Sequence, residues 1–105
     1  MVNPAWGDVW WSEAPHEKSR PYLILTRDEA IPILTRVLAA PVTSTARGIP
    51  TELQIGTNEG LPIECVASMD NLTSVRKGYL IKRMGAIDRA RRREVCAAIA
   101  AAIDC

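Results

Sequence analysis

The stretch EKSRPYLILTR, residues 17–27, predicts a short buried strand that begins directly after a charged residue. Its apolar centre, from Pro21 to Leu25, is too short to favour a helix and is typical of a strand buried in a sheet. Pro21 fixes one backbone angle at the entrance to that strand. Arg20, whose side chain is permanently charged, therefore stands at the mouth of the strand.

Further short strands are predicted before and after this one. In residues 51–56, Leu53 and Ile55 alternate with Glu52 and Gln54, which is the period of a strand with one buried face. The other strands are predicted at residues 7–11, 33–43, 63–68 and 79–84. Between the strands, the sequence predicts a loop at residues 12–20, one helical turn at 27–31 and a turn with a short helix at 70–78. Pro41 favours an edge or a bulge near the end of its strand, because proline cannot donate a ladder hydrogen bond.

The last segment predicts a helix. Asp88 is a good N-cap residue, and apolar residues then recur at steps of three and four, giving one apolar face. These residues are Val95, Ala98, Ile99, Ala102 and Ile103. Several short strands followed by one helix indicate a single α+β domain over residues 1–105, a small antiparallel β-barrel with the C-terminal helix packed on it.

Composition limits the classes of function. The net charge is +1, so an anion-binding site must be a local patch. Cys65, Cys96 and Cys105 show no close pairing, and the apolar surroundings of the first two predict reduced, buried thiols and a cytoplasmic protein. No signal peptide and no apolar stretch of about 20 residues is present, so no membrane association is expected.

Several kinds of chemistry are disfavoured. The chain has one histidine, no CxxC and no carboxylates at metal-ligand spacing, so neither a metal nor a cofactor is expected. Glycine-rich phosphate-binding motifs are absent. A nucleophilic triad would have to use His16, which lies in a proline-flanked loop.

Cationic and hydroxyl groups remain. Arg20 begins one predicted strand, Thr43 and Ser44 end another, and Arg47 follows. A guanidinium binds two phosphate oxygens at once and hydroxyls add hydrogen bonds, so this set suits a phosphodiester. The alternative is a surface arginine and an ordinary threonine at the end of a strand.

Two other features have open interpretations. Trp10 and Trp11 point to opposite faces of one strand, so one is expected in the core, and the other stacks a base or fills a dimer interface. The basic run at residues 89–93 is typical of the solvated face of a helix. Its alternatives are docking of a polyanion and pairing with an acidic partner segment.

Six motifs in order resemble those of the MazF/PemK-like toxins of bacterial toxin–antitoxin modules. They are WGDVWW at 6–11, SRPYLIL at 19–25, APVTS at 40–44, IPTELQI at 49–55, DNLTSV at 70–75 and RMGAID at 83–88. The resemblance implies an SH3-like barrel that works as a homodimer. It also implies metal-independent, sequence-specific cleavage of single-stranded RNA, in which the 2′-OH attacks to give 2′,3′-cyclic phosphate and 5′-OH ends.

By position in these motifs, Arg20 corresponds to the catalytic arginine and Thr43 to the catalytic threonine, with Ser44 and Thr45 as alternatives to Thr43. The expected substrate-binding residues are Trp11, His16, Glu17, Lys18, Ser44, Arg47, Asp70 and Asn71. A cognate antitoxin with an acidic tail is expected to cover the RNA groove, against Lys18, Arg20 and Arg47.

The chain departs from the family pattern in three places. The segment between Thr43 and Pro50 is short, which leaves Ser44 and Thr45 as alternatives to Thr43. The loop at residues 13–19 is short and lacks glycine, and Asn71 replaces a common glutamine. The cleaved RNA sequence is therefore not transferable. Two other functions remain open: a gyrase poison of the CcdB type, whose usual Trp-Gly-Ile tail is missing here, and an SH3-like module that binds RNA or peptide without cleavage.

Overall fold

The computed structural model describes residues 3–104 and shows seven strands and one α-helix. The strands are β1 (Asp8–Ser12), β2 (Arg20–Ile24), β3 (Arg36–Thr43), β4 (Glu52–Ile55), β5 (Cys65–Ser68), β6 (Thr73–Arg76) and β7 (Leu80–Ala86). The helix α1 spans Arg92–Ile103, and short 3₁₀ turns occupy Thr57–Glu59, Met69–Asn71, Lys77–Tyr79 and Arg89–Arg91. Within residues 3–104, no helix has the length and apolar character needed to cross a bilayer.

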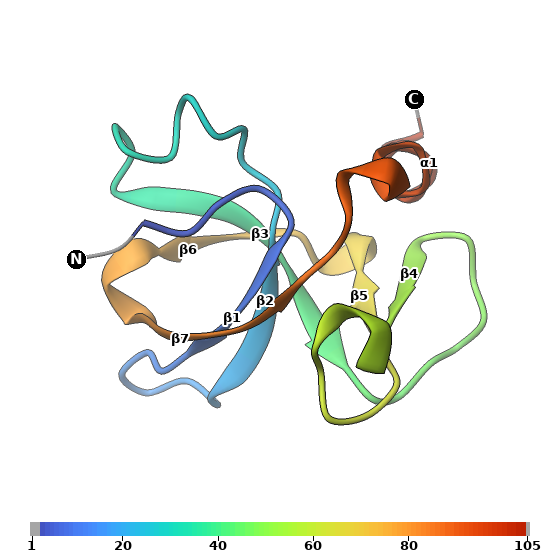
Figure 1. Ribbon diagram of the computed structural model, residues 1–105, viewed down its shortest axis with the longest axis horizontal. Helices are drawn as coiled ribbons and strands as arrows, with labels where there is room; N and C mark the ends of the chain where they lie inside the picture. Colours follow the sequence, from blue (N-terminus) through green and yellow to red (C-terminus); the bar gives the residue numbers. More distant parts are fainter. Residues whose placement is uncertain (1–2, 105) are drawn as a thin grey trace.

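All strand pairs are antiparallel, in the order β4-β5-β3-β2-β1-β7, with β6 also paired to β3. The sheet curls into a half-barrel, with β4, β5 and α1 grouped at one side of it (Figure 1). The predicted antiparallel barrel with a C-terminal helix is confirmed. Strand β6, at residues predicted to form a turn with a short helix, was not expected.

Strand β3 lies inside the sheet, but Pro41, where an edge or a bulge is predicted, is paired on one side only. One side of β3 pairs with β2, with Tyr22 opposite Pro41. On the other side, residues 36–39 pair with β6 and residues 42–43 with β5. Pro41 lies in the gap between these two partners, where the lack of an N–H group interrupts neither ladder.

Alternation along the strands builds two cores, one on each face of the sheet. Val9, Leu23 and Val42 join the larger cluster, which α1 covers with Val95 and Ala98. The smaller cluster on the other face is formed by Trp10, Ile24, Ile31, Val37, Ala39, Val75 and Leu80. The predicted apolar face of α1 is confirmed at Val95 and Ala98, whereas Ile103 is 57% exposed.

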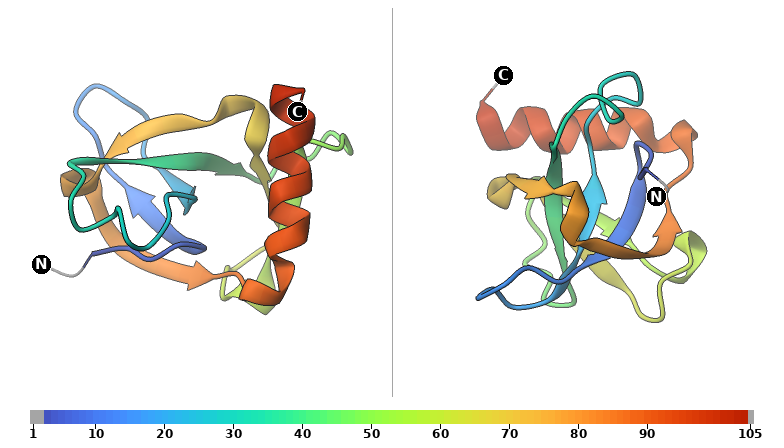
Figure 2. Two further views of the ribbon diagram at one scale, coloured as in Figure 1. Left: turned by 90° about the horizontal axis from the view of Figure 1, so that it is seen from above. Right: turned by 90° about the vertical axis from the view of Figure 1, so that its left-hand side faces the viewer.

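The arginine run is not simply a solvated face. Arg91 bonds the backbone carbonyl of Gln54 at 2.7 Å and pairs with Glu59 and Glu94, and these carboxylates raise its pKa. Arg89 pairs with Asp28. It also lies over the Trp6 ring, 5.1 Å from the centroid. These contacts tie the start of α1 to the barrel, and Figure 2 shows the helix running across its end.

The thiols differ from the prediction of buried cysteines. Cys65 is half-buried and Cys96 is exposed on α1. Cys105 lies outside the described residues. Cys96 is exposed because the buried stripe of α1 runs through Val95 and Ala98, and Cys96 lies about 100° around the helix from Val95.

Candidate active site

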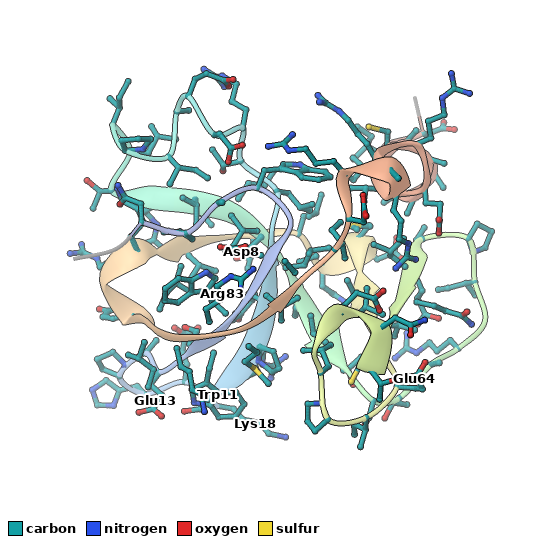
Figure 3. All side chains as sticks on the ribbon, viewed as in Figure 1. Asp8, Trp11, Glu13, Lys18, Glu64 and Arg83 are labelled. Atoms are coloured by element: carbon teal, nitrogen blue, oxygen red, sulfur yellow. The ribbon has the colours of Figure 1, made fainter. Side chains whose placement is uncertain are left out.

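A groove of about 410 Å³ opens where β2 begins and β3 ends. Trp11, Lys18, Arg20, Thr43 and Ser44 contribute to its wall. The remaining lining residues are Ser19, Pro21, Val42, Leu61, Pro62, Ile63, Cys65 and Met84. Five of the residues predicted to act on the substrate therefore meet in one groove, and Figure 3 shows two of them, Trp11 and Lys18, close together in the lower part of the view.

Strand register explains why Arg20 and Thr43 meet. Tyr22 lies opposite Pro41 in the antiparallel pair of β2 and β3. Arg20 is two residues before Tyr22, and Thr43 is two residues after Pro41. Side chains two apart share a face, so both residues extend from the same side of neighbouring strands into the groove.

The hydroxyl of Thr43 is oriented by its own loop. Its Oγ1 accepts a hydrogen bond from the backbone N–H of Thr45 at 3.2 Å. That bond uses an acceptor lone pair and leaves the hydroxyl proton available for donation. Ser44 also lines the groove, whereas Thr45 does not. The geometry thus favours Thr43 over Thr45 and leaves Ser44 beside it.

The guanidinium of Arg20 is half-buried and available. Within residues 3–104, no hydrogen bond or ion pair joins it to another side chain, whereas Arg83, Arg89 and Arg91 all pair with carboxylates. A positively charged fork without a protein partner, at the wall of a groove, is suited to an anionic ligand.

The two neighbouring tryptophans differ as expected. Trp10 is 9% exposed, and its indole N–H donates to the buried Asp8 at 3.1 Å. Trp11 lines the groove, and its indole N–H donates to Glu13 at 2.9 Å. This bond holds the ring in place and leaves its faces available for stacking.

Other predicted residues lie outside the groove. His16 is exposed at the tip of the loop between β1 and β2, with a positive φ of 64°. Glu17 lines a second pocket nearby. The backbone N–H of Arg47 donates to Glu52, Asp70 accepts from Thr51, and Asn71 donates to Ser68. The fold of the chain brings none of these four positions, His16, Arg47, Asp70 or Asn71, to the groove.

The floor of the groove contains residues that the sequence did not identify. Leu61 comes from the turn before β5, Cys65 from β5 and Met84 from β7. Burial raises the pKa of the Cys65 thiol, and the negative charge of Glu64 adds to this shift. No local signal marks these residues, because the curl of the sheet alone brings them beside β2.

A family model matches almost the whole chain. The family described as PemK-like, MazF-like toxin of type II toxin–antitoxin system matches residues 5–103. The chain belongs to this family. Its relatives include the probable endoribonuclease MazF5 of Mycobacterium tuberculosis, 38% identical over 97% of this chain and 94% of the relative. The endoribonuclease MazF3 of the same organism is 36% identical over 84% and 85%.

Solved structures agree with this assignment. The Mycobacterium tuberculosis toxin MazF-mt6 has a TM-score of 0.85 and 33% identity, covering 92% of this chain and 96% of that one. A mycobacterial endoribonuclease in complex with its cognate antitoxin has a TM-score of 0.83 and 26% identity, over 96% and 95%. The predicted resemblance is confirmed, and the chain is a MazF-like toxin of the endoribonuclease class.

Proposed function

We propose that this MazF-like toxin cleaves single-stranded RNA at a short sequence, without a metal ion, through attack of a ribose 2′-OH. The observation that carries the proposal is the groove in which the unpaired Arg20 guanidinium and the oriented Thr43 hydroxyl lie together. This pair fits a phosphodiester, because one group supplies charge and two donors and the other a single donor.

The proposed reaction needs few groups besides Arg20 and Thr43. The 2′-oxygen forms a bond to phosphorus, and the bond from phosphorus to the 5′-oxygen breaks. The 2′-OH loses a proton and the leaving 5′-oxygen gains one, giving a 2′,3′-cyclic phosphate and a 5′-OH. Negative charge builds on the phosphorane oxygens during this step. Arg20 and Thr43 stabilise that charge more than they stabilise the substrate, which lowers the barrier.

The groove also has groups for holding RNA. Trp11 supplies a ring on which a base stacks, and Lys18 and Ser44 supply donors for the backbone. His16 and Glu17, on the β1–β2 loop, are proposed to contact bases. Arg47, Asp70 and Asn71 lie elsewhere on the protomer, and their proposed contact with RNA requires a longer substrate path.

The proposed assembly is a homodimer that an antitoxin inhibits in the cytoplasm. Exposed apolar side chains on the sheet, including Leu38 at 45% and Ile81 at 55%, are available for contact between protomers. The mycobacterial relative solved with its cognate antitoxin supports an antitoxin partner here. An acidic antitoxin segment is expected to lie against Lys18 and Arg20, with Arg47 as a further contact.

The test is to incubate the purified protein with a long RNA in EDTA and to map the new 5′ ends. We expect cleavage at one short sequence, with 5′-OH products. No cleavage in EDTA across substrates that cover all short sequences would refute the proposal. Inhibition of DNA gyrase, or RNA binding without new ends, would assign the alternative functions instead.

Replacing Arg20 by alanine is expected to reduce kcat by at least about a hundredfold, because a preorganised charge at the transition state is lost. Arg93→Ala is the matched control, since Arg93 is exposed on α1 and outside the groove. Both variants should keep the circular dichroism spectrum of the parent. Full activity of Arg20→Ala would show that Arg20 has no catalytic role.

A further inference from the structure

A second, smaller pocket of about 140 Å³ lies on the other side of Lys18 from the active-site groove. Besides Lys18, its charged lining residues are Arg36 from β3, Arg76 from β6 and Glu17. Hydroxyl-bearing side chains complete much of the wall: Ser12, Tyr22, Thr73, Ser74 and Tyr79. We call this site the arginine pocket.

Arg36 and Arg76 lie directly opposite each other in the pairing of β3 with β6. Like charges at opposed positions of an antiparallel pair destabilise it. Within the part of the chain that the structure describes, neither of these arginines has an ion pair with a carboxylate, and nor does Lys18. Three cations therefore share the pocket with the single carboxylate of Glu17.

One of the two guanidinium groups is already oriented. The Nε of Arg36 donates to the Ser74 hydroxyl at 2.9 Å, and its Nη2 donates to the Ser74 carbonyl at 2.9 Å. The Nη1 donors and the second N–H of Nη2 remain, and no hydrogen bond among residues 3–104 uses the guanidinium of Arg76. A fixed guanidinium, a second one across the strand pair and several hydroxyls are a donor set suited to a phosphate group.

We propose that the arginine pocket binds a backbone phosphate of the RNA next to the scissile phosphate. This inference rests on the proposed function. Lys18 lines both the pocket and the groove, so an RNA strand with one phosphate against Arg20 passes Lys18 and places a neighbouring phosphate between Arg36 and Arg76. The bound phosphate also removes the repulsion between the two opposed arginines.

The test variant is Arg76→Gln, since Arg76 is exposed and no other described side chain depends on it. Arg93→Gln is the control for loss of one positive charge. The probe is a single-stranded RNA of about ten nucleotides that contains the mapped cleavage site and a 2′-O-methyl group on the attacking ribose, so that binding is measured without cleavage. Neutral methylphosphonates replace the phosphates flanking the scissile one, singly in separate probes.

We expect Arg76→Gln to bind the unmodified probe about tenfold more weakly than the parent, as for loss of a charged hydrogen bond. The slope of log Kd against log salt should fall in magnitude by about 0.7. At one of the two positions, the methylphosphonate should weaken RNA binding by the parent about tenfold. It should not weaken binding by Arg76→Gln any further, because both changes remove the same contact. Arg76→Lys should show an intermediate loss, and Arg93→Gln none.

Cleavage by the parent is measured separately and tests only the proposed function. If the parent cleaves RNA but Arg76→Gln binds the probe as the parent does, the phosphate assignment is wrong. It is equally wrong if each methylphosphonate weakens both proteins by the same factor. Weaker binding of an oligoglutamate peptide by Arg76→Gln, with unchanged binding of RNA, would assign the pocket to an acidic peptide instead.

Discussion

At the scale of single residues, the groove bears on the choice of Thr43 over its alternatives Ser44 and Thr45. Thr43, Ser44 and Thr45 are consecutive hydroxyl residues, and motif position alone does not rank them securely. In the structure Thr43 and Ser44 line the groove, and the backbone N–H of Thr45 orients the Thr43 hydroxyl. The role of Thr45 is therefore carried by its backbone, and its side chain is replaceable.

Substitution of Thr43 and of Thr45 tests this ranking. Thr43→Ala should lower kcat about a hundredfold, because it removes a donor to the developing charge, and Thr43→Ser should retain much of the activity. Thr45→Ala should cleave as the parent does, because the backbone N–H remains. The measurement is cleavage of the mapped RNA substrate in EDTA. A larger loss in Thr45→Ala than in Thr43→Ala would reverse the assignment.

Cys65 gives a second test at this scale, through pH. Its pKa is raised, so less of the thiol is ionised at a given pH than for an ordinary cysteine, and the reactive thiolate appears only at higher pH. At neutral pH, iodoacetamide should label the exposed Cys96 well before Cys65, and labelling of Cys65 should rise steeply above pH 9. Mass spectrometry of tryptic peptides distinguishes the sites. Rapid labelling of Cys65 at neutral pH would contradict the shift.

At the scale of elements, the local sequence pattern predicts a strand well where apolar residues alternate clearly. It fails where a segment becomes a strand only because a neighbouring strand is available for pairing. Residues 73–76 contain one buried residue, Val75, among polar neighbours, so they read as a turn. They form β6 because the backbone of β3 is available beside them. The glycine of the RMGAID motif also has a structural explanation. Gly85 on β7 has no Cβ, so the backbone of the turn at residues 57–60 can lie close against it.

Gly85→Ala should destabilise the fold. An added Cβ at Gly85 would lie 1.9 Å from the carbonyl oxygen of Glu59, so the backbone must shift. We expect a loss of about 1–3 kcal/mol in the free energy of unfolding, measured with urea. Gly78→Ala is the control, because a Cβ there meets nothing within 4 Å. Equal stability of the two variants would show that the close approach is not required.

At the scale of the whole molecule, one buried carboxylate helps to close the barrel. Asp8 is 7% exposed and accepts hydrogen bonds from the Ala5 backbone, the Trp10 indole and Arg83. These partners join the N-terminal segment, β1 and β7. Figure 3 shows Asp8 and Arg83 inside the curve of the sheet. The aspartate of the WGDVWW motif therefore has a structural role, and it does not line the groove.

Asp8→Ala is expected to reduce the free energy of unfolding by about 1–3 kcal/mol, because it leaves the donors of Trp10 and Ala5 without their acceptor. Loss of the ion pair with Arg83 should cost less stability, because Arg83 is partly exposed and water replaces the Asp8 carboxylate as its partner. Glu29→Ala, which removes an exposed carboxylate, should change stability little. Urea titration, monitored by tryptophan fluorescence, measures the stability of both variants. An unchanged midpoint for Asp8→Ala would remove the proposed role in closure.

The sequence by itself determined the order of most strands, the apolar face of the helix, and the residues of the groove that lie at strand ends. These follow from local rules, because side-chain period, proline and capping act over a few residues. The predicted cap Asp88 caps the 3₁₀ turn Arg89–Arg91, whereas α1 itself begins after Arg91. Only the tertiary structure decided that Arg20 faces Thr43, that Cys65 and Met84 line the same groove, and that Arg36 faces Arg76. Those pairs are separated by tens of residues, and strand register and the curl of the sheet bring them together.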